Sequence, residues 1–174
     1  MNPTPTVPGS HFAGAAAARR AIELVQPTVD ALMPDRRVCG GGFLAVVVMD
    51  PARPAGSATF DDAVLLEHSV GDRARWDADY LGFARAKARL AWTHGTDAHA
   101  VQSLRPHLLR EGDSLLWGSV WLDGIAVGVS GAEAWYDEFF GTAIAAALRA
   151  VAKEAHAAAV GARALVAGAQ GRGG

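Results

Sequence analysis

Apolar positions along the chain recur at two different periods, and the change of period separates the expected helices from the expected strands. Steps of three and four residues predict amphipathic helices over residues 15–32, 80–94 and 133–156, the last packing back on the segment before it. Pro27 lacks a backbone donor, so the first helix should end or kink near Gln26. Gly95 should stop the second helix.

Runs rich in β-branched residues predict strands at 43–49 and 63–70, and the first, being uninterrupted, is expected at the centre of a sheet. A hairpin is expected where apolar segments 113–122 and 125–130 flank Asp123-Gly124, because this dipeptide supplies the positive φ angles of a tight type I′ turn. Hairpins and helices follow one another without regular βαβ alternation. The sequence therefore predicts an α+β fold with an antiparallel β-sheet flanked by α-helices.

Composition sets the expected domain boundaries. The chain has 174 residues, which suits one domain with its own core, predicted at 14–160. Residues 1–13 are rich in proline and residues 161–174 in alanine, glycine and arginine, so both ends are predicted to be disordered. Three further segments read as connections or short elements: a flexible joint at 33–42, a polar loop at 71–79, and a short helix from Thr96 or Asp97 to Leu104.

Charge and cysteine content narrow the class of function. With a formal charge of −2, the chain lacks the excess of basic residues expected of a protein that binds nucleic acid or an anionic membrane. No apolar run is long enough to suggest a transmembrane helix. Cys39 is the single cysteine, which excludes an internal disulfide and a cysteine-based zinc site. The first residues lack the features of a secretion signal, so a cytoplasmic protein is expected.

The histidines offer candidate chemistry without a common hydrolytic or zinc motif. His94 and His99 flank Gly95 and could converge on a pocket rim, although a histidine at the end of a helix is also favoured by the helix dipole alone. His68, near the end of a predicted strand, is a candidate iron ligand or a structural histidine with a hydrogen-bond partner. His11, His107 and His156 complete the set.

Charged and aromatic residues supply further candidates, each with a structural alternative. Lys87 lies between Arg85 and Arg89, and residues two apart on a helix do not share a face, so at most one of the three points at a site. Trp117 and Trp121 are four residues apart on the predicted strand, so their side chains should lie on the same face of the sheet. There they would belong to the core, to a subunit interface or to the wall of a ligand pocket. Asp137 and Glu138, early in the last helix, would otherwise complement its positive end.

Two segments resemble the GlcG/HbpS-like family of haem-binding or haem-degrading domains, over roughly residues 15–158. Lys87-Ala-Arg-Leu-Ala-Trp-Thr-His-Gly-Thr96 is similar to the family's Lys-Ala-x-x-Ala-x-x-Phe-Gly-x-Ser/Thr segment, and Gly124-Ile-Ala-Val-Gly-Val-Ser-Gly131 precedes the acidic pair at 137–138. The chain departs from the family at His94, where phenylalanine is usual, at Trp117-Gly118-Ser119-Val120, where Gly-Gly-x-Pro is usual, and in the extra loop at 71–79.

The resemblance implies a profilin-like α+β fold, a homo-oligomer of at least two chains, and haem as cofactor, with haem binding and haem degradation as the implied functions. Iron would be ligated by His94 or His68. A second hypothesis is a biosynthetic enzyme acting on a non-haem small molecule with His94 as acid-base group. A third is a non-catalytic oligomeric partner protein. The sequence leaves the actual ligand open.

The expected pocket lies between the C-terminal end of the 80–94 helix and the hairpin. His94 is its most informative residue, because an imidazole replacing an apolar side chain in a core needs a partner or solvent. Lys87, two turns earlier, falls on nearly the same helix face. The candidate catalytic residues are therefore His94, Lys87 and Glu138, and the candidate ligand-binding residues are Trp117, Trp121, His99 and Asp137.

Overall fold

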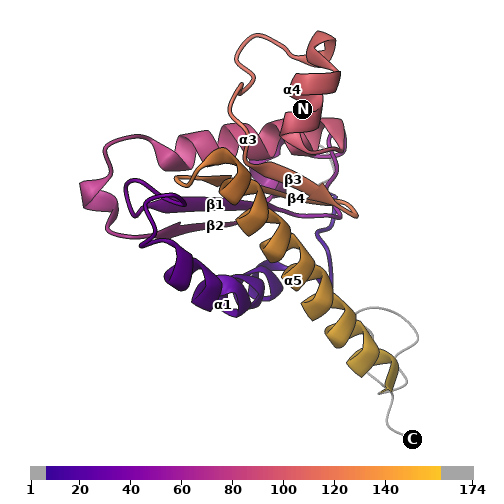
Figure 1. Ribbon diagram of the computed structural model, residues 1–174. Helices are drawn as coiled ribbons and strands as arrows, with labels where there is room; N and C mark the ends of the chain where they lie inside the picture. Colours follow the sequence, from indigo (N-terminus) through magenta and orange to yellow (C-terminus); the bar gives the residue numbers. More distant parts are fainter. Residues whose placement is uncertain (1–6, 162–174) are drawn as a thin grey trace, which may run out of the picture.

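The computed structural model describes residues 7–161, in which helices cover both faces of one antiparallel sheet (Figure 1). The predicted α+β class is confirmed. The sheet has the order β2-β1-β4-β3, and its strands are β1 Leu44–Met49, β2 Val64–Val70, β3 Ser119–Leu122 and β4 Ile125–Ser130. The longer helices are α1 Ala15–Leu32, α3 Tyr80–His94 and α5 Ala134–Gly161, and the short ones are α2 Phe60–Ala63, α4 Ala98–Leu104 and the 3₁₀ turns η1 Arg73–Arg75 and η2 Pro106–Leu108.

Strand β1 is central, as its uninterrupted apolar run predicts. All six of its residues are buried, and it pairs with β2 on one side and β4 on the other. Because side chains alternate along a strand, Val46 and Val48 enter the core under α1 and α5, whereas Val47 and Met49 enter the core under α3. One strand thus supplies both apolar layers.

The hairpin turn is confirmed, but the predicted first strand is too long. Asp123 has φ 49° and Gly124 φ 91°, the left-handed values that a type I′ turn requires. Pairing runs back only as far as Ser119 opposite Gly128. Residues 113–118 leave the ladder at Gly118, whose φ is 110°. Trp117 is therefore not on the strand, and the expectation that it shares a strand face with Trp121 is wrong.

Helix α3 packs directly on β4 because Gly128 has no side chain. A Cβ atom built there would lie 2.3 Å from the Ala84 carbonyl oxygen and 2.6 Å from the Ala88 nitrogen. Ala84 and Ala88 are themselves fully buried. The close approach of backbone to backbone fixes the height of α3 over the sheet and the position of every side chain that α3 directs inward.

Helix α1 continues through Pro27 to Leu32, so of the two expected outcomes, an end or a kink near Gln26, the end is wrong. Pro27 is exposed, and the residues on either side of it, Val25 and Val29, are buried in the core. A proline removes one helical hydrogen bond. Tertiary packing supplies most helical stability in proteins, so buried contacts before and after the proline hold the helix together.

Helix α5 packs on the hairpin as expected, but with a different face. Trp135 and Phe139 belong to the apolar positions whose three- and four-residue spacing predicts this helix, yet they are 58% and 45% exposed. The buried face instead carries Asp137, Phe140, Gly141, Ile144, Ala145 and Leu148. The inward turn of Asp137 sets this rotation, since the other buried residues follow it at three- and four-residue intervals. The exposed aromatic side chains are compatible with self-association, which stays a prediction.

The predicted terminal arms fall partly outside the described residues, which exclude 1–6 and 162–174. Within the N-terminal arm, the Val7 carbonyl accepts a hydrogen bond from Arg53 Nε at 3.0 Å, and the Ser10 N–H donates to Asp50 Oδ1 at 3.1 Å. At the other end, α5 reaches Gly161. Within 7–161, no helix combines the length and apolar content needed to cross a membrane.

Replacing Gly128 with alanine should lower the free energy of unfolding by at least about 2 kcal/mol, because the added methyl group meets backbone atoms that have no room to move. Gly40→Ala is the matched control, since a Cβ atom there meets nothing within 4 Å. Urea unfolding followed by tryptophan fluorescence measures both. Equal stability of the two variants would contradict the proposed close packing of α3 on β4.

Candidate functional site

A buried ion pair joins α3 to the start of α5. Lys87 Nζ donates to Asp137 Oδ2 at 2.8 Å and to the Val129 carbonyl oxygen at 3.0 Å. The other oxygen of Asp137, Oδ1, accepts from the Ala132 N–H at 3.0 Å. Lys87 is 3% exposed and Asp137 1%. Of the cationic residues singled out on α3, Lys87 thus points inward, whereas Arg85 pairs with Asp61 and Glu67 at the surface.

The ion pair lies where the β3 strand would otherwise continue. The Val129 N–H donates to the Gly118 carbonyl at 2.7 Å, but the Val129 carbonyl accepts from Lys87 instead of from the chain opposite. A Cβ atom at Gly118 would lie 2.8 Å from Lys87 Nζ and 2.6 Å from Asp137 Cβ. The pairing of β3 with β4 therefore stops at Ser119 because the Lys87 amine occupies the space beside β4.

Burial dominates the electrostatics of Asp137. Removal from water raises the pKa of its carboxyl group to about 7, while the nearby Lys87 ammonium and the Ala132 N–H act in the opposite direction. The Glu133 carboxylate adds a smaller upward contribution. Asp137 is thus poised to gain or lose a proton near neutral pH, in direct contact with a lysine.

A cavity of about 250 Å³ opens beside the ion pair. It receives side chains from α3, from the segment before β3 and from the junction of β4 with α5. Ser130, only 5% exposed, is among them. The lining residues are Tyr80, Lys87, Leu116, Trp117, Ser130, Gly131, Ala132, Ala134 and Asp137.

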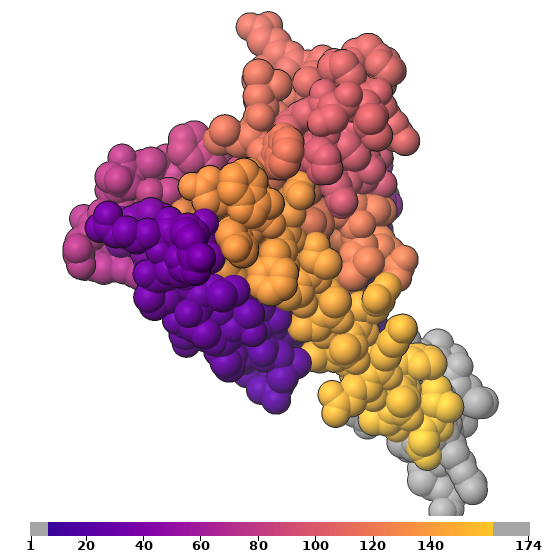
Figure 2. All heavy atoms as spheres, in the orientation of Figure 1, coloured from indigo at the N-terminus to yellow at the C-terminus, as the bar shows by residue number. Residues whose placement is uncertain are grey.

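Next to this cavity, α4 approaches the same end of α5, and α4 with the loop after it projects from the body of the molecule (Figure 2). His99 Nδ1 lies 3.3 Å from Glu138 Oε1, and the His99 ring stacks on Trp117 with centroids 4.6 Å apart. Burial raises the pKa of the Glu138 carboxyl group, and His99 opposes the rise. Asp97 Oδ1 accepts from the Trp121 N–H at 2.7 Å, which ties α4 to β3.

The structure therefore gathers most of the predicted site residues at one end of the sheet. Lys87, Asp137 and Trp117 line the cavity, and His99 with Glu138 adjoins it. His94 and Trp121 do not line this cavity. His94 is the last residue of α3, and its Nε2 atom is buried without a hydrogen-bond partner among the described residues. Trp121 packs against the apolar cluster under α3.

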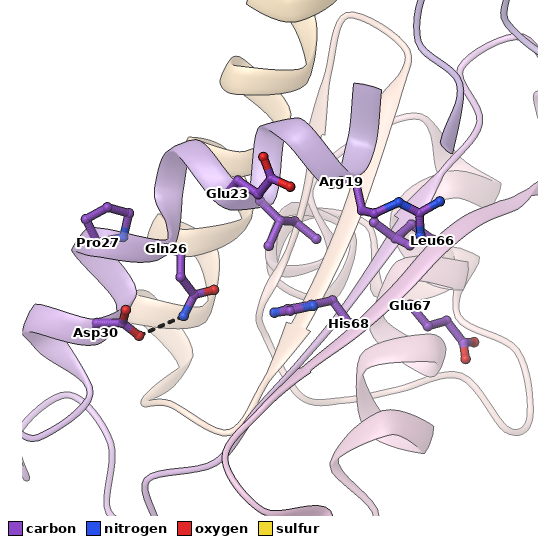
Figure 3. A pocket seen from close by; sticks show the side chains of 9 residues that line it. Arg19, Glu23, Gln26, Pro27, Asp30, Leu66, Glu67 and His68 are labelled. Atoms are coloured by element: carbon purple, nitrogen blue, oxygen red, sulfur yellow. Dashed lines mark hydrogen bonds between the residues drawn. The ribbon is translucent and has the colours of Figure 1, made fainter. Parts of the chain in front are cut away.

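His68 lies elsewhere, in a groove of about 560 Å³ between α1 and the edge strand β2. Figure 3 shows its imidazole reaching from β2 toward α1, with Glu23 and Gln26 on the helix. Ile22 and Leu66 also line the groove. Removal from water lowers the pKa of the half-buried His68. The remaining lining residues are Arg19, Pro27, Asp30 and Glu67.

Sequence reasoning missed some of the residues around both cavities. Ser130 and Tyr80 carry no motif of their own, although Ser130 stands within the glycine-bounded segment that suggested the family. On the α1 side of the groove, the sequence pattern predicts a helix and gives no sign of a binding surface. Among the described residues, no group of three or more His, Cys, Asp or Glu side chains is placed to hold a metal ion.

Comparisons with known proteins agree on the fold and go no further. No family model matches the sequence, and no curated protein matches it. Among solved structures, the chain is similar to protein ORFY of Klebsiella pneumoniae, described as a member of family DUF336, with a TM-score of 0.50 and 18% identity over 86% of this chain and 97% of ORFY. DUF336 is the GlcG-like domain family. The likeness shows a shared fold.

Lys87→Met should lower the free energy of unfolding at pH 8 by about 3 kcal/mol, because it leaves a buried carboxylate without its partner. The double variant Lys87→Met/Asp137→Leu should cost clearly less than the sum of the two single changes. Lys153→Met, at an exposed position on α5, is the control and should change stability by less than about 0.5 kcal/mol. Additive single and double changes would show that the two charges are not coupled.

The raised pKa of Asp137 predicts stability that falls with rising pH. From an ordinary pKa of 3.8 in the unfolded chain to about 7 in the folded one, the folded protein holds a proton that the unfolded chain releases. The free energy of unfolding should therefore decrease between pH 4 and 7, on the order of 3 kcal/mol. Asp137→Asn should flatten this dependence in urea titrations. An unchanged slope in that variant would assign the proton to another group.

Proposed function

We propose that the protein binds a small ligand in the groove between α1 and β2, and that this ligand is haem with His68 on the iron. The observation that carries the proposal is an imidazole inside a groove of about 560 Å³ with apolar walls. Ligand pockets usually measure about 300–1,000 Å³ and combine apolar walls with a few polar groups. The groove meets both conditions.

The residues in the groove fit the chemistry of haem. Neutral imidazole is the form that binds iron, and burial favours the neutral form of His68. Ile22 and Leu66 offer apolar surface to a macrocycle, and Arg19 offers a cation to a propionate. Two of the carboxylates nearby already have cationic partners, since Glu23 pairs with Arg20 and Glu67 with Arg85.

Other histidines fit less well. The Nε2 atom of His94 is enclosed by protein, so iron could not approach it without a rearrangement. The cavity beside Lys87 measures about 250 Å³, below the usual range for ligands of this size. Bound haem would supply a redox-active iron whose reactivity depends on the axial ligand and on burial. Slow haem breakdown is the corresponding enzymatic proposal, and it rests on the same binding step.

Titration of the full-length protein with haemin should produce a shifted Soret band. His68→Ala should weaken binding at least about tenfold, equivalent to 1.4 kcal/mol. Two control variants should leave the band and the affinity unchanged: His107→Ala, at an exposed position, and His94→Phe, which introduces the residue usual in the resembling family. Loss of the band in His94→Phe, with full binding by His68→Ala, would move the iron to His94 and refute the groove as the site.

A further inference from the structure

The cavity beside the Lys87–Asp137 ion pair is a separate feature from the groove, because the two share no lining residue. We propose that it binds a small, uncharged, planar compound with a carbonyl oxygen, which accepts a hydrogen bond from Lys87. The inference does not depend on haem binding. It rests on the donors, the charge balance and the walls of the cavity.

The cavity has hydrogen-bonding capacity that the protein does not use. A lysine ammonium carries three N–H donors. Lys87 uses one on the Val129 carbonyl and one on Asp137, and it lines the cavity with a third donor to spare. Ser130, which is 5% exposed, adds a hydroxyl group to the same lining. Buried donors normally use their hydrogen-bonding capacity, so a buried ammonium group with one donor to spare beside a cavity points to an occupant.

Charge balance argues for an uncharged occupant. The cation of Lys87 is already matched by the carboxylate of Asp137 at 2.8 Å, and the Asp137 side chain is 1% exposed. A second carboxylate in the cavity would leave one buried negative charge without a partner, which is costly in an environment removed from water. A carbonyl oxygen accepts a hydrogen bond from the ammonium group without adding charge.

The walls and the size set the shape of the ligand. Trp117 and Leu116 form one side, and the junction of β4 with α5 forms another. Trp117 is held by its stacking on His99, at an angle of 29° between the rings. Aromatic walls favour flat ligands that pack against the ring face. A cavity of about 150 Å³ holds benzene, so 250 Å³ has room for one ring with a short substituent.

Acetophenone is a suitable probe, because it combines one ring with one uncharged carbonyl group. Ligand-detected NMR and calorimetry on the full-length protein at pH 8 should show binding in the millimolar range or tighter. Benzoate adds a charge and ethylbenzene removes the oxygen, so both should bind at least about tenfold more weakly. If benzoate bound as tightly as acetophenone, the proposal that the ligand is uncharged would be wrong. If acetophenone did not bind, the proposal that the cavity is a binding site would be wrong.

Variants locate the binding. Ser130→Ala and Trp117→Ala should each weaken the binding of acetophenone at least threefold. Trp135→Ala, which removes an exposed tryptophan outside the cavity, should leave this binding unchanged. Thermal unfolding of each variant confirms that it is folded. Haemin titration should be unchanged in Ser130→Ala, so failure of either proposal is distinguishable from failure of the other. Acetophenone affinity unchanged in Ser130→Ala and Trp117→Ala would place the probe elsewhere and refute the inference.

Discussion

The ion pair between Lys87 and Asp137 is the constraint on which the rest of this structure depends. It connects α3, on one face of the sheet, with α5, on the other, across the end of the β3–β4 hairpin. Because the amine also holds the Val129 carbonyl, β3 cannot extend along that part of β4. The short strand, the rotation of α5 and the small cavity beside the pair all follow from the placement of this one cation.

Burying such a pair costs desolvation free energy, and its stabilising effect depends on hydrogen-bond geometry as well as on the attraction between the charges. Desolvation of two charges offsets much of their Coulomb energy, so a buried pair persists only where further hydrogen bonds complete it. Here the Val129 carbonyl and the Ala132 N–H provide those bonds. The rise in the pKa of Asp137 shows that burial outweighs the nearby cation. The arrangement therefore specifies one packing of α3 and α5 while leaving a titratable group beside the cavity.

The two cavities differ in origin and in chemistry. The groove at His68 exists because α1 packs mainly against α5 and leaves the edge strand β2 only partly buried. It is the larger of the two and has apolar walls, and it contains the His68 imidazole, whose lowered pKa favours the neutral form. The cavity at Lys87 lies beside the start of the β3–β4 hairpin, and its ammonium donor is balanced by the Asp137 carboxylate. The two cavities therefore differ in size, lining and charge.

The sequence by itself determined the features that depend on local chemistry. Asp123-Gly124 has the left-handed backbone that a type I′ turn requires, Gly95 ends α3, and the β-branched run of β1 occupies the centre of the sheet. The sequence also placed Lys87 on the second long helix and Asp137 with Glu138 early in the last one. Only the tertiary structure decided where β3 begins, which face of α5 is buried, and that His68 rather than His94 opens on a cavity. These outcomes depend on contacts between residues far apart in the chain, such as Lys87 with Asp137, whose energies no local pattern of apolar and polar positions contains.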